Sequence, residues 1–176
     1  MTGKLHLITG CMFAGKSTAL LRAASNVDPE HVVVVKSKRD DRYTTQSEVR
    51  THSGISFKCV IAEELRQILS EPLYAKATHI FVDEGQFFAD LSDTAKEMVE
   101  IHGKVVTVAA LTGDFKMKPF TCVAEVAAAA DTVEWLYAKC QHCEDVAAFS
   151  RKIDKSTDLE VGGASLYEPV CRRHFA

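Results

Sequence analysis

Gly10-Cys11-Met12-Phe13-Ala14-Gly15-Lys16-Ser17 is the stretch that decides the fold. It fits the P-loop pattern in full, and the apolar run at 5–8 is typical of the strand that precedes such a loop. The glycines allow backbone N–H groups to turn toward phosphate oxygens, Lys16 reaches the terminal phosphates, and the Ser17 hydroxyl can ligate magnesium at a helix N-terminus. A chance match in a glycine-containing turn is the alternative. The strand before the loop and the helix expected after it favour a nucleoside triphosphate site.

A second motif, Phe81-Val82-Asp83-Glu84-Gly85-Gln86-Phe87-Phe88, places two acids at the end of an apolar strand. From this position Asp83 can hold magnesium through water beside the P-loop serine. Glu84 points elsewhere, so it can accept a proton from an attacking hydroxyl or polarise a water. A solvated acid at a strand end is the alternative for Glu84. The amide and aromatic residues that follow it favour a lined pocket instead.

Apolar, β-branched runs alternate with helical patterns along the chain. Strands are expected at 5–9, 32–35, 57–61, 80–82 and 105–109. Helices are expected at 16–25, 62–69, 93–102 and 121–130. This alternation predicts an α/β fold, a P-loop NTPase-type parallel sheet with helices on both faces. Because the loops that follow parallel strands share one edge of the sheet, the two motifs should lie together.

Length and composition limit the possible classes of protein. With 176 residues we expect one main nucleotide-binding domain, residues 1–131, and a small C-terminal lobe, residues 132–176. A charged fraction of 26% and a net charge of -3 give no basic footprint, so no stable nucleic acid partner is expected. The sequence has no apolar run of about 18–20 residues and no signal-peptide pattern, which predicts a cytoplasmic protein without a membrane partner.

Cysteine spacing predicts a metal site in the lobe. In a reducing compartment six cysteines argue against a disulfide framework. Cys140 with Cys143, and Cys171 with His174, are two pairs at x₂ spacing that can supply tetrahedral Cys₃His ligation of zinc. Four protein ligands close such a site, so the zinc would be structural. Buried free thiols are one alternative, and His142 in place of a cysteine is another.

The run Arg39-Asp40-Asp41-Arg42-Tyr43 follows the second predicted strand, on the presumed active edge. An arginine there could stabilise charge on a transferring phosphoryl group. A solvated charge cluster is the more common interpretation of such a run. Two polar segments, 37–54 and 154–164, are long enough to be functional loops.

With these residues in view, the chain resembles the type II thymidine kinases, the family of cytosolic human, poxviral and many bacterial thymidine kinases. The resemblance covers nearly the whole length, and its most specific segments are 10–18, 40–43, 81–88, 111–120 and 161–174. It implies transfer of the γ-phosphate of ATP to the 5′-hydroxyl of thymidine or deoxyuridine, with magnesium, in pyrimidine deoxynucleotide salvage. It also implies a homotetramer and feedback inhibition by thymidine triphosphate (dTTP).

The resemblance assigns roles to individual residues. The catalytic residues would be Glu84 as general base, Arg42 near the phosphates, and Lys16. The ATP- and phosphate-binding residues would be Gly10, Met12, Phe13, Ala14, Gly15, Lys16, Ser17, Thr18 and Asp83, with Ser17 and Asp83 also holding magnesium. A lasso-like loop at 154–167 would close over the nucleoside. The nucleoside-binding residues would be Met12, Gln86, Phe87, Leu111, Phe115, Phe120, Ser150, Glu160, Gly162 and Tyr167.

Some residues depart from the family pattern. Ala14 stands where many members have serine, and Ser150 replaces a frequent threonine near the thymine methyl group, which leaves the preference between thymidine and deoxyuridine open. Two other functions stay possible on the residues alone. One is a zinc-containing NTPase switch in which Glu84 polarises water, marked by ATPase activity without nucleoside. The other is a deoxynucleoside kinase with a different or broader base preference.

Overall fold

The computed structural model describes residues 3–39, 48–50, 56–153 and 165–175. Its largest element is a seven-stranded sheet in the order β3-β4-β2-β5-β6-β1-β7. The strands are β1 (Lys4–Gly10), β2 (Val32–Ser37), β3 (Glu48–Arg50), β4 (Ser56–Ala62), β5 (His79–Val82), β6 (Val105–Leu111) and β7 (Thr132–Leu136). Only the edge strand β3 among these runs antiparallel to its neighbour. The predicted α/β fold with a central parallel sheet is confirmed.

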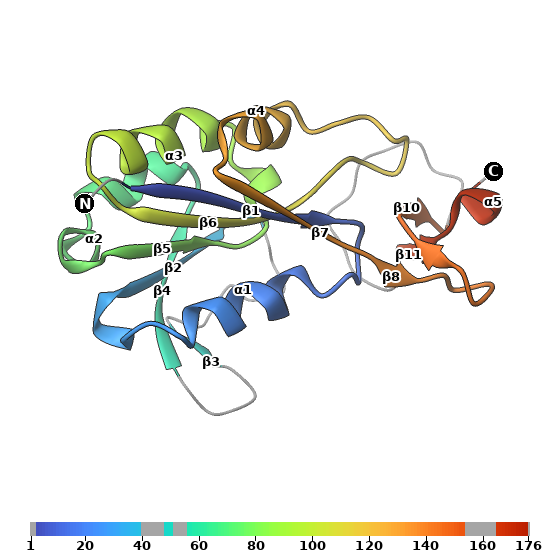
Figure 1. Ribbon diagram of the computed structural model, residues 1–176, viewed down its shortest axis with the longest axis horizontal. Helices are drawn as coiled ribbons and strands as arrows, with labels where there is room; N and C mark the ends of the chain where they lie inside the picture. The colour runs from blue at the N-terminus through green and yellow to red at the C-terminus, as the bar shows by residue number, and fades with distance from the viewer. Residues whose placement is uncertain (1–2, 40–47, 51–55, 154–164, 176) are drawn as a thin grey trace.

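Helices cover both faces of the sheet (Figure 1). Helix α1 (Lys16–Ala24) lies on one face, and α3 (Leu91–Glu100) and α4 (Thr121–Ala129) lie on the other. The shorter helices are η1 (Pro29–His31), η3 (Leu65–Ser70), α2 (Pro72–Lys76) and η4 (Gly85–Phe87).

Strand β2 begins with four consecutive valines because both of its faces are buried. Val32 and Val34 belong to the core cluster that contains Leu20 of α1, whereas Val33 and Val35 belong to the cluster beneath α3 and α4. Successive side chains of a strand point to opposite faces, and here both faces are covered. The apolar run therefore marks a central strand rather than a helix.

One predicted helix, at 62–69, was wrong in both start and type. Strand β4 continues to Ala62, which lies opposite Ser37 of β2, and a 3₁₀ helix begins only at Leu65. The Asp90 carboxylate accepts the backbone N–H groups of Leu65 and Arg66 at 3.0 and 2.8 Å. This cap comes from a segment 25 residues further along the chain, so the local pattern could not reveal it.

The C-terminal lobe contains two short antiparallel sheets and a helix. They are β8 (Ala138–Lys139) with β9 (Val146–Ala147), β10 (Phe149–Lys152) with β11 (Tyr167–Val170), and α5 (Arg172–Phe175). The lobe lies beyond the end of β1 in Figure 1. The predicted boundary after residue 131 stays a prediction. Strand β7, which begins at Thr132, pairs with β1 in the large sheet, and the lobe's own strands begin at Ala138.

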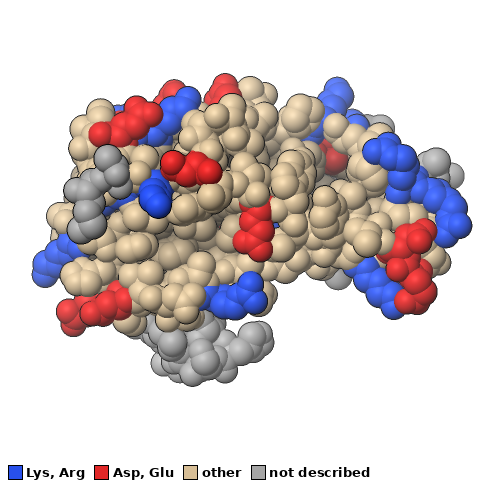
Figure 2. Space-filling model, viewed as in Figure 1, with Lys and Arg blue, Asp and Glu red and all other residues tan. Residues whose placement is uncertain are grey.

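The surface carries charges of both signs. On the face shown in Figure 2, lysine and arginine side chains lie among aspartate and glutamate side chains. This mixture gives that face no continuous positive field of the kind that binds a phosphate backbone. Among the helices of the described ranges, none combines the length and the apolar composition that a membrane crossing requires.

Candidate active site

A cavity of about 390 Å³ lies where the loops after β1, β5 and β6 meet the C-terminal lobe. It brings together predicted phosphate and nucleoside residues from across the chain. The predicted residues that line it are Met12, Phe13, Gly15, Lys16, Ser17, Thr18, Glu84, Gln86, Phe87, Leu111, Phe115, Phe120, Ser150 and Tyr167. The structure therefore gathers both predicted parts of the site around one space, while the role of each residue stays a prediction.

The P-loop connects β1 to α1 through two glycines with positive φ. A Cβ atom at Gly10 would collide with the carbonyl oxygen of Leu136, which lies on the neighbouring strand β7. Gly15 adopts φ +85° at the N-cap of α1, in the left-handed region that favours glycine. Lys16 is buried, and its Nζ donates to the carbonyl oxygen of Cys11 at 2.7 Å. The lysine is thus folded back over its own loop, at the wall of the cavity.

Ser17 and Asp83 form the pair expected to hold magnesium. The Ser17 hydroxyl donates to Asp83 Oδ1 at 2.9 Å, and the Asp83 N–H continues the sheet by donating to Val35 O at 2.9 Å. Burial, followed by the nearby Glu84 carboxylate, raises the pKa of Asp83 to about 6, while the Ser17 hydrogen bond and Lys36 oppose the rise. Oxygen ligands of this kind suit magnesium. A bound cation would favour the ionised carboxylate that the buried position disfavours.

Glu84 is held in an unusual backbone conformation at the cavity. Its φ of 50° and ψ of 44° lie in the left-handed region, which costs a non-glycine residue free energy and is found often at functional sites. Gln86 Nε2 donates to Glu84 Oε2 at 2.6 Å, and Gln86 Oε1 accepts the Leu111 N–H at 3.0 Å. Because the oxygen of the amide is fixed by β6, its nitrogen must face the carboxylate. Gln86 therefore orients Glu84, a task that its position in the sequence did not reveal.

Aromatic side chains line the other end of the cavity. The rings of Phe115 and Tyr167 lie 6.3 Å apart between centroids with their planes at 48°. Lys152 is buried, and its Nζ lies 5.6 Å from the centroid of the Phe115 ring. Tyr167 on β11 pairs with Lys152 on β10, so the lobe supplies one wall and the segment after β6 supplies the other. Such a wall suits a flat, partly apolar ligand.

Several predicted residues do not line this cavity. Asp40, Arg42, Glu160 and Gly162 lie outside the described residues. Gly10, Ala14 and Asp83 are described but are not part of the lining, and Asp83 contacts it through Ser17.

Three further residues line the cavity: Arg39, Gly113 and Asp114. Arg39 belongs to the charged run predicted on the active edge, whereas no individual role was expected for Gly113 or Asp114. Each lies just after a parallel strand, β2 or β6, at the edge where ligands bind in open α/β sheets. The position after a parallel strand was the feature of the sequence that could have indicated these residues. For Arg39 it could not be distinguished from a solvated charge cluster.

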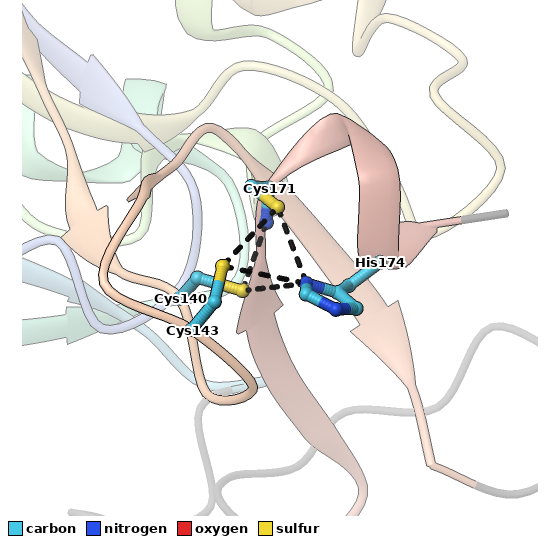
Figure 3. A group of neighbouring side chains, drawn as sticks. All are labelled: Cys140, Cys143, Cys171 and His174. Atoms are coloured by element: carbon cyan, nitrogen blue, oxygen red, sulfur yellow. Dashed lines mark hydrogen bonds between the residues drawn. The ribbon is translucent and has the colours of Figure 1, made fainter.

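The four residues predicted to bind zinc come together in the lobe (Figure 3). Their ligand atoms all lie within 4.8 Å of one another. Cys143 Sγ lies 3.8 Å from Cys171 Sγ. His174 Nδ1 lies 3.6, 3.5 and 3.4 Å from the sulfurs of Cys140, Cys143 and Cys171. The turn between β8 and β9 supplies Cys140 and Cys143, while Cys171 lies between β11 and α5 and His174 lies within α5.

The Cys143–Cys171 separation and the three distances from His174 Nδ1 to sulfur fit the donor set of a structural zinc ion. With Zn–S bonds of about 2.3 Å and Zn–N bonds of about 2.0–2.1 Å, a tetrahedral site has ligand atoms roughly 3.5–3.8 Å apart. His142 is not in this group, because its Nε2 lies 3.1 Å from Glu168 Oε2 instead. The alternative in which His142 replaces a cysteine is therefore not supported. The Arg151 guanidinium links the two ligand pairs, because it lies 2.8 Å from His142 Nε2 beside Cys143 and also donates to the His174 carbonyl oxygen.

Comparison with known proteins gives the family. A family model described as thymidine kinase matches residues 3–175. A thymidine kinase of Oryza sativa subsp. japonica is 39% identical over 180 residues, covering 98% of this chain and 66% of the relative. Thymidine kinase a of Arabidopsis thaliana is 39% identical over 181 residues, covering 99% of this chain and 75% of the relative. The thymidine kinase of Myxoma virus (strain Lausanne) is 38% identical over 176 residues, covering 98% and 96%. The resemblance carried by the motifs is confirmed, and the chain belongs to the thymidine kinase family.

Proposed function

We propose that this protein transfers the γ-phosphate of ATP to the 5′-hydroxyl of thymidine, and also of deoxyuridine. The observation that carries the proposal is the single cavity that joins the P-loop, the Glu84 carboxylate and the aromatic wall. A kinase needs its phosphate donor and its acceptor side by side with a base between them. Membership of the thymidine kinase family supports the nucleoside as acceptor.

At the phosphate end the residues act by position and charge. Lys16 would turn from the Cys11 carbonyl oxygen toward the terminal phosphates, since both are oxygen acceptors at the same loop. Ser17 and Asp83 would hold magnesium, which neutralises phosphate charge when bound. We assign Arg42 a supporting role near the transferring group from the family resemblance alone.

At the reacting end Glu84 would accept the proton of the 5′-hydroxyl. Its carboxylate is oriented by Gln86 and its backbone is fixed between β5 and η4, so little rearrangement is needed at the moment of transfer. Phe115, Tyr167 and the neighbouring side chains would exclude water from the base and sugar. Exclusion of water favours transfer to the nucleoside over hydrolysis.

Further properties of the protein follow from the family and belong to the same proposal. We expect deoxynucleotide salvage in the cytoplasm, a homotetramer, and inhibition by dTTP, whose base and phosphates could span both ends of the cavity. The Cys₃His group supports a structural zinc ion rather than a catalytic one, because four protein ligands leave no open position. Glu160 and Gly162 are proposed to contact the pyrimidine edge.

The test is ATP-dependent phosphorylation of thymidine, deoxyuridine, deoxycytidine and uridine with magnesium, with ADP measured in parallel. Thymidine-dependent product that disappears in Lys16→Ala is the expected result. Glu84→Gln should bind nucleoside normally and lose most turnover, about 100-fold or more, because it keeps the shape and removes the base. ADP release that does not depend on nucleoside would refute the kinase and favour an NTPase switch.

A further inference from the structure

The phosphate-binding turn is tied to the C-terminal lobe by two hydrogen bonds. The Met12 N–H donates to Ser150 Oγ at 2.9 Å, and the Cys11 thiol donates to the Ala147 carbonyl oxygen at 3.3 Å. Ser150 on β10 and Ala147 on β9 are both buried. The bonded residues lie 138 and 136 positions apart in the chain. These contacts can therefore form only when the lobe is folded against the sheet.

Cys11 also contacts the catalytic lysine. Its carbonyl oxygen accepts from Lys16 Nζ at 2.7 Å and from the Ala14 N–H at 3.4 Å. One residue thus contacts the lysine through its carbonyl group and the lobe through its thiol. A displacement of about 1 Å in a positioning element can reduce a rate by about 100-fold. The position of Cys11 therefore sets where Lys16 Nζ lies in the unliganded turn, the position from which the lysine would move to the phosphates.

An apolar contact accompanies the hydrogen bonds. Cys11 shares a buried cluster with Ala147, Val170 and two of the metal-site cysteines, Cys140 and Cys171. The floor of the phosphate turn and the metal centre therefore belong to one small core. A core of this size is rarely stable without a metal or disulfides. Order in the lobe, and hence zinc binding by its four ligand residues, should determine order in the turn.

We propose that the C-terminal lobe braces the phosphate-binding turn, with Cys11 and Ser150 as positioning residues, so that nucleotide affinity depends on the lobe before any nucleoside binds. The inference rests on the proposed function only in taking the P-loop as a nucleotide site. In this proposal the Ser150 hydroxyl holds the phosphate-binding turn through Met12, in addition to lining the nucleoside cavity. The lobe then supports both substrates.

The test measures binding of MgADP by titration calorimetry, without nucleoside. Ser150→Ala removes the acceptor of the Met12 N–H and should weaken binding about three- to tenfold, the usual effect of losing one neutral hydrogen bond. Ser150→Thr keeps the hydroxyl and should bind as the wild type does. Ser25→Ala is the matched control, because the Ser25 hydroxyl donates to Leu21 O at 2.8 Å just after the far end of α1. It should leave the affinity unchanged.

Hydrogen exchange distinguishes positioning from a general loss of stability. In Ser150→Ala the Met12 N–H should exchange faster, while the amides of α3 on the opposite face keep their protection. Removal of zinc from the wild type by a chelator should also make the Met12 N–H exchange faster, and should reduce MgADP affinity by at least as much as Ser150→Ala does, because it releases both hydrogen bonds and the shared cluster. Unchanged MgADP affinity in Ser150→Ala would overturn the brace. Loss of thymidine affinity alone would also overturn it, because the hydroxyl would then serve the base.

Failure of the brace and failure of the proposed function give different results. A wild type that binds MgADP in a Ser150-dependent way but does not phosphorylate thymidine would refute the proposed function and support the brace. An active thymidine kinase whose MgADP affinity is unaffected both by Ser150→Ala and by zinc removal would refute the brace alone.

Discussion

Replacing Asp83 by asparagine should stabilise the unliganded protein at alkaline pH while abolishing magnesium-dependent phosphorylation. Burial and the adjacent Glu84 raise the pKa of Asp83 from 3.8 to about 6. One pKa unit is worth about 1.4 kcal/mol, so the ionised side chain costs the folded protein roughly 3 kcal/mol at pH 8. Asparagine carries no charge and avoids this cost. The site would thus be one where stability is lost for the sake of cation binding.

The pH dependence follows from which state binds the proton more tightly. Because the pKa of Asp83 is higher in the folded protein than its ordinary value of 3.8, the unfolded chain ionises first as pH rises. The wild type therefore loses stability between about pH 4 and pH 6 and is level above that. The advantage of Asp83→Asn should be roughly 3 kcal/mol at pH 8 and about half of that at pH 5.

Asp83→Asn should remove the negative charge while keeping the hydrogen bonds of the side chain. Ser17 Oγ and the Glu84 N–H both donate to Oδ1 of Asp83, at 2.9 and 3.1 Å, and an asparagine retains an oxygen at this position. Asp28→Asn is the matched control, because Asp28 is exposed and caps η1, where asparagine caps as well as aspartate. It removes the same charge and should show no advantage that grows with pH.

Thermal unfolding without magnesium or nucleotide is the assay. For a chain of this length the expected difference at pH 8 corresponds to a rise of about 6–12 °C in Tm, with about half of that at pH 5. Magnesium should raise the Tm of the wild type and leave Asp83→Asn unchanged. An Asp83→Asn protein no more stable than the wild type at pH 8, or more stable by the same amount at both pH values, would contradict the reasoning.

Three further outcomes are expected. Arg39→Gln should weaken MgATP binding about tenfold, because Arg39 lines the cavity together with the P-loop residues. Lys38→Gln removes the same charge from a side chain that is 70% exposed and should change binding little. Equal losses of affinity in calorimetric titration would refute this. Cys171→Ser should reduce bound zinc below one per chain in elemental analysis and lower Tm by at least about 5 °C, unlike Cys122→Ser, which lies outside the ligand group. Gln86→Leu should reduce kcat about tenfold or more with little change in KM for ATP, because it releases the Glu84 carboxylate, the proposed general base, and leaves the P-loop intact. Steady-state kinetics with unchanged kcat would disprove this orienting role.

The central strands could be predicted because burial on both faces produces continuous apolar runs. Strand β2 is the clearest case, with all six residues buried. The edge strand β7 could not, because Glu134 and Trp135 are exposed and its five residues show neither a continuous run nor a clean alternation. Its place in the sheet is set by pairing with β1 across more than 120 residues. The local sequence pattern indicates which strands are buried, whereas the strand that each one pairs with depends on the rest of the chain.

The candidate site likewise contains residues that local sequence motifs indicate and residues that only tertiary contacts bring in. Lys16, Ser17 and Glu84 lie in motifs of neighbouring residues, so the sequence could indicate them as candidates. Arg39 and Asp114 belong to the cavity only through tertiary contact. The second task of Gln86, orienting the carboxylate, depends on an acceptor bond from β6, which sequence spacing cannot express.

Cys11 shows why the two predicted domains are better treated as one mechanical unit. Cys11 is a buried residue of the P-loop. The core it belongs to, however, contains Cys140 and Cys171 of the metal centre, while its carbonyl oxygen accepts from Lys16. A cluster shared in this way couples substitutions on either side of it, since sites that share packing contacts are not additive. Variants of the metal centre and of the P-loop should therefore show interaction energies when combined. Variants of the metal centre and of α3, whose buried residues belong to a different core cluster, should add.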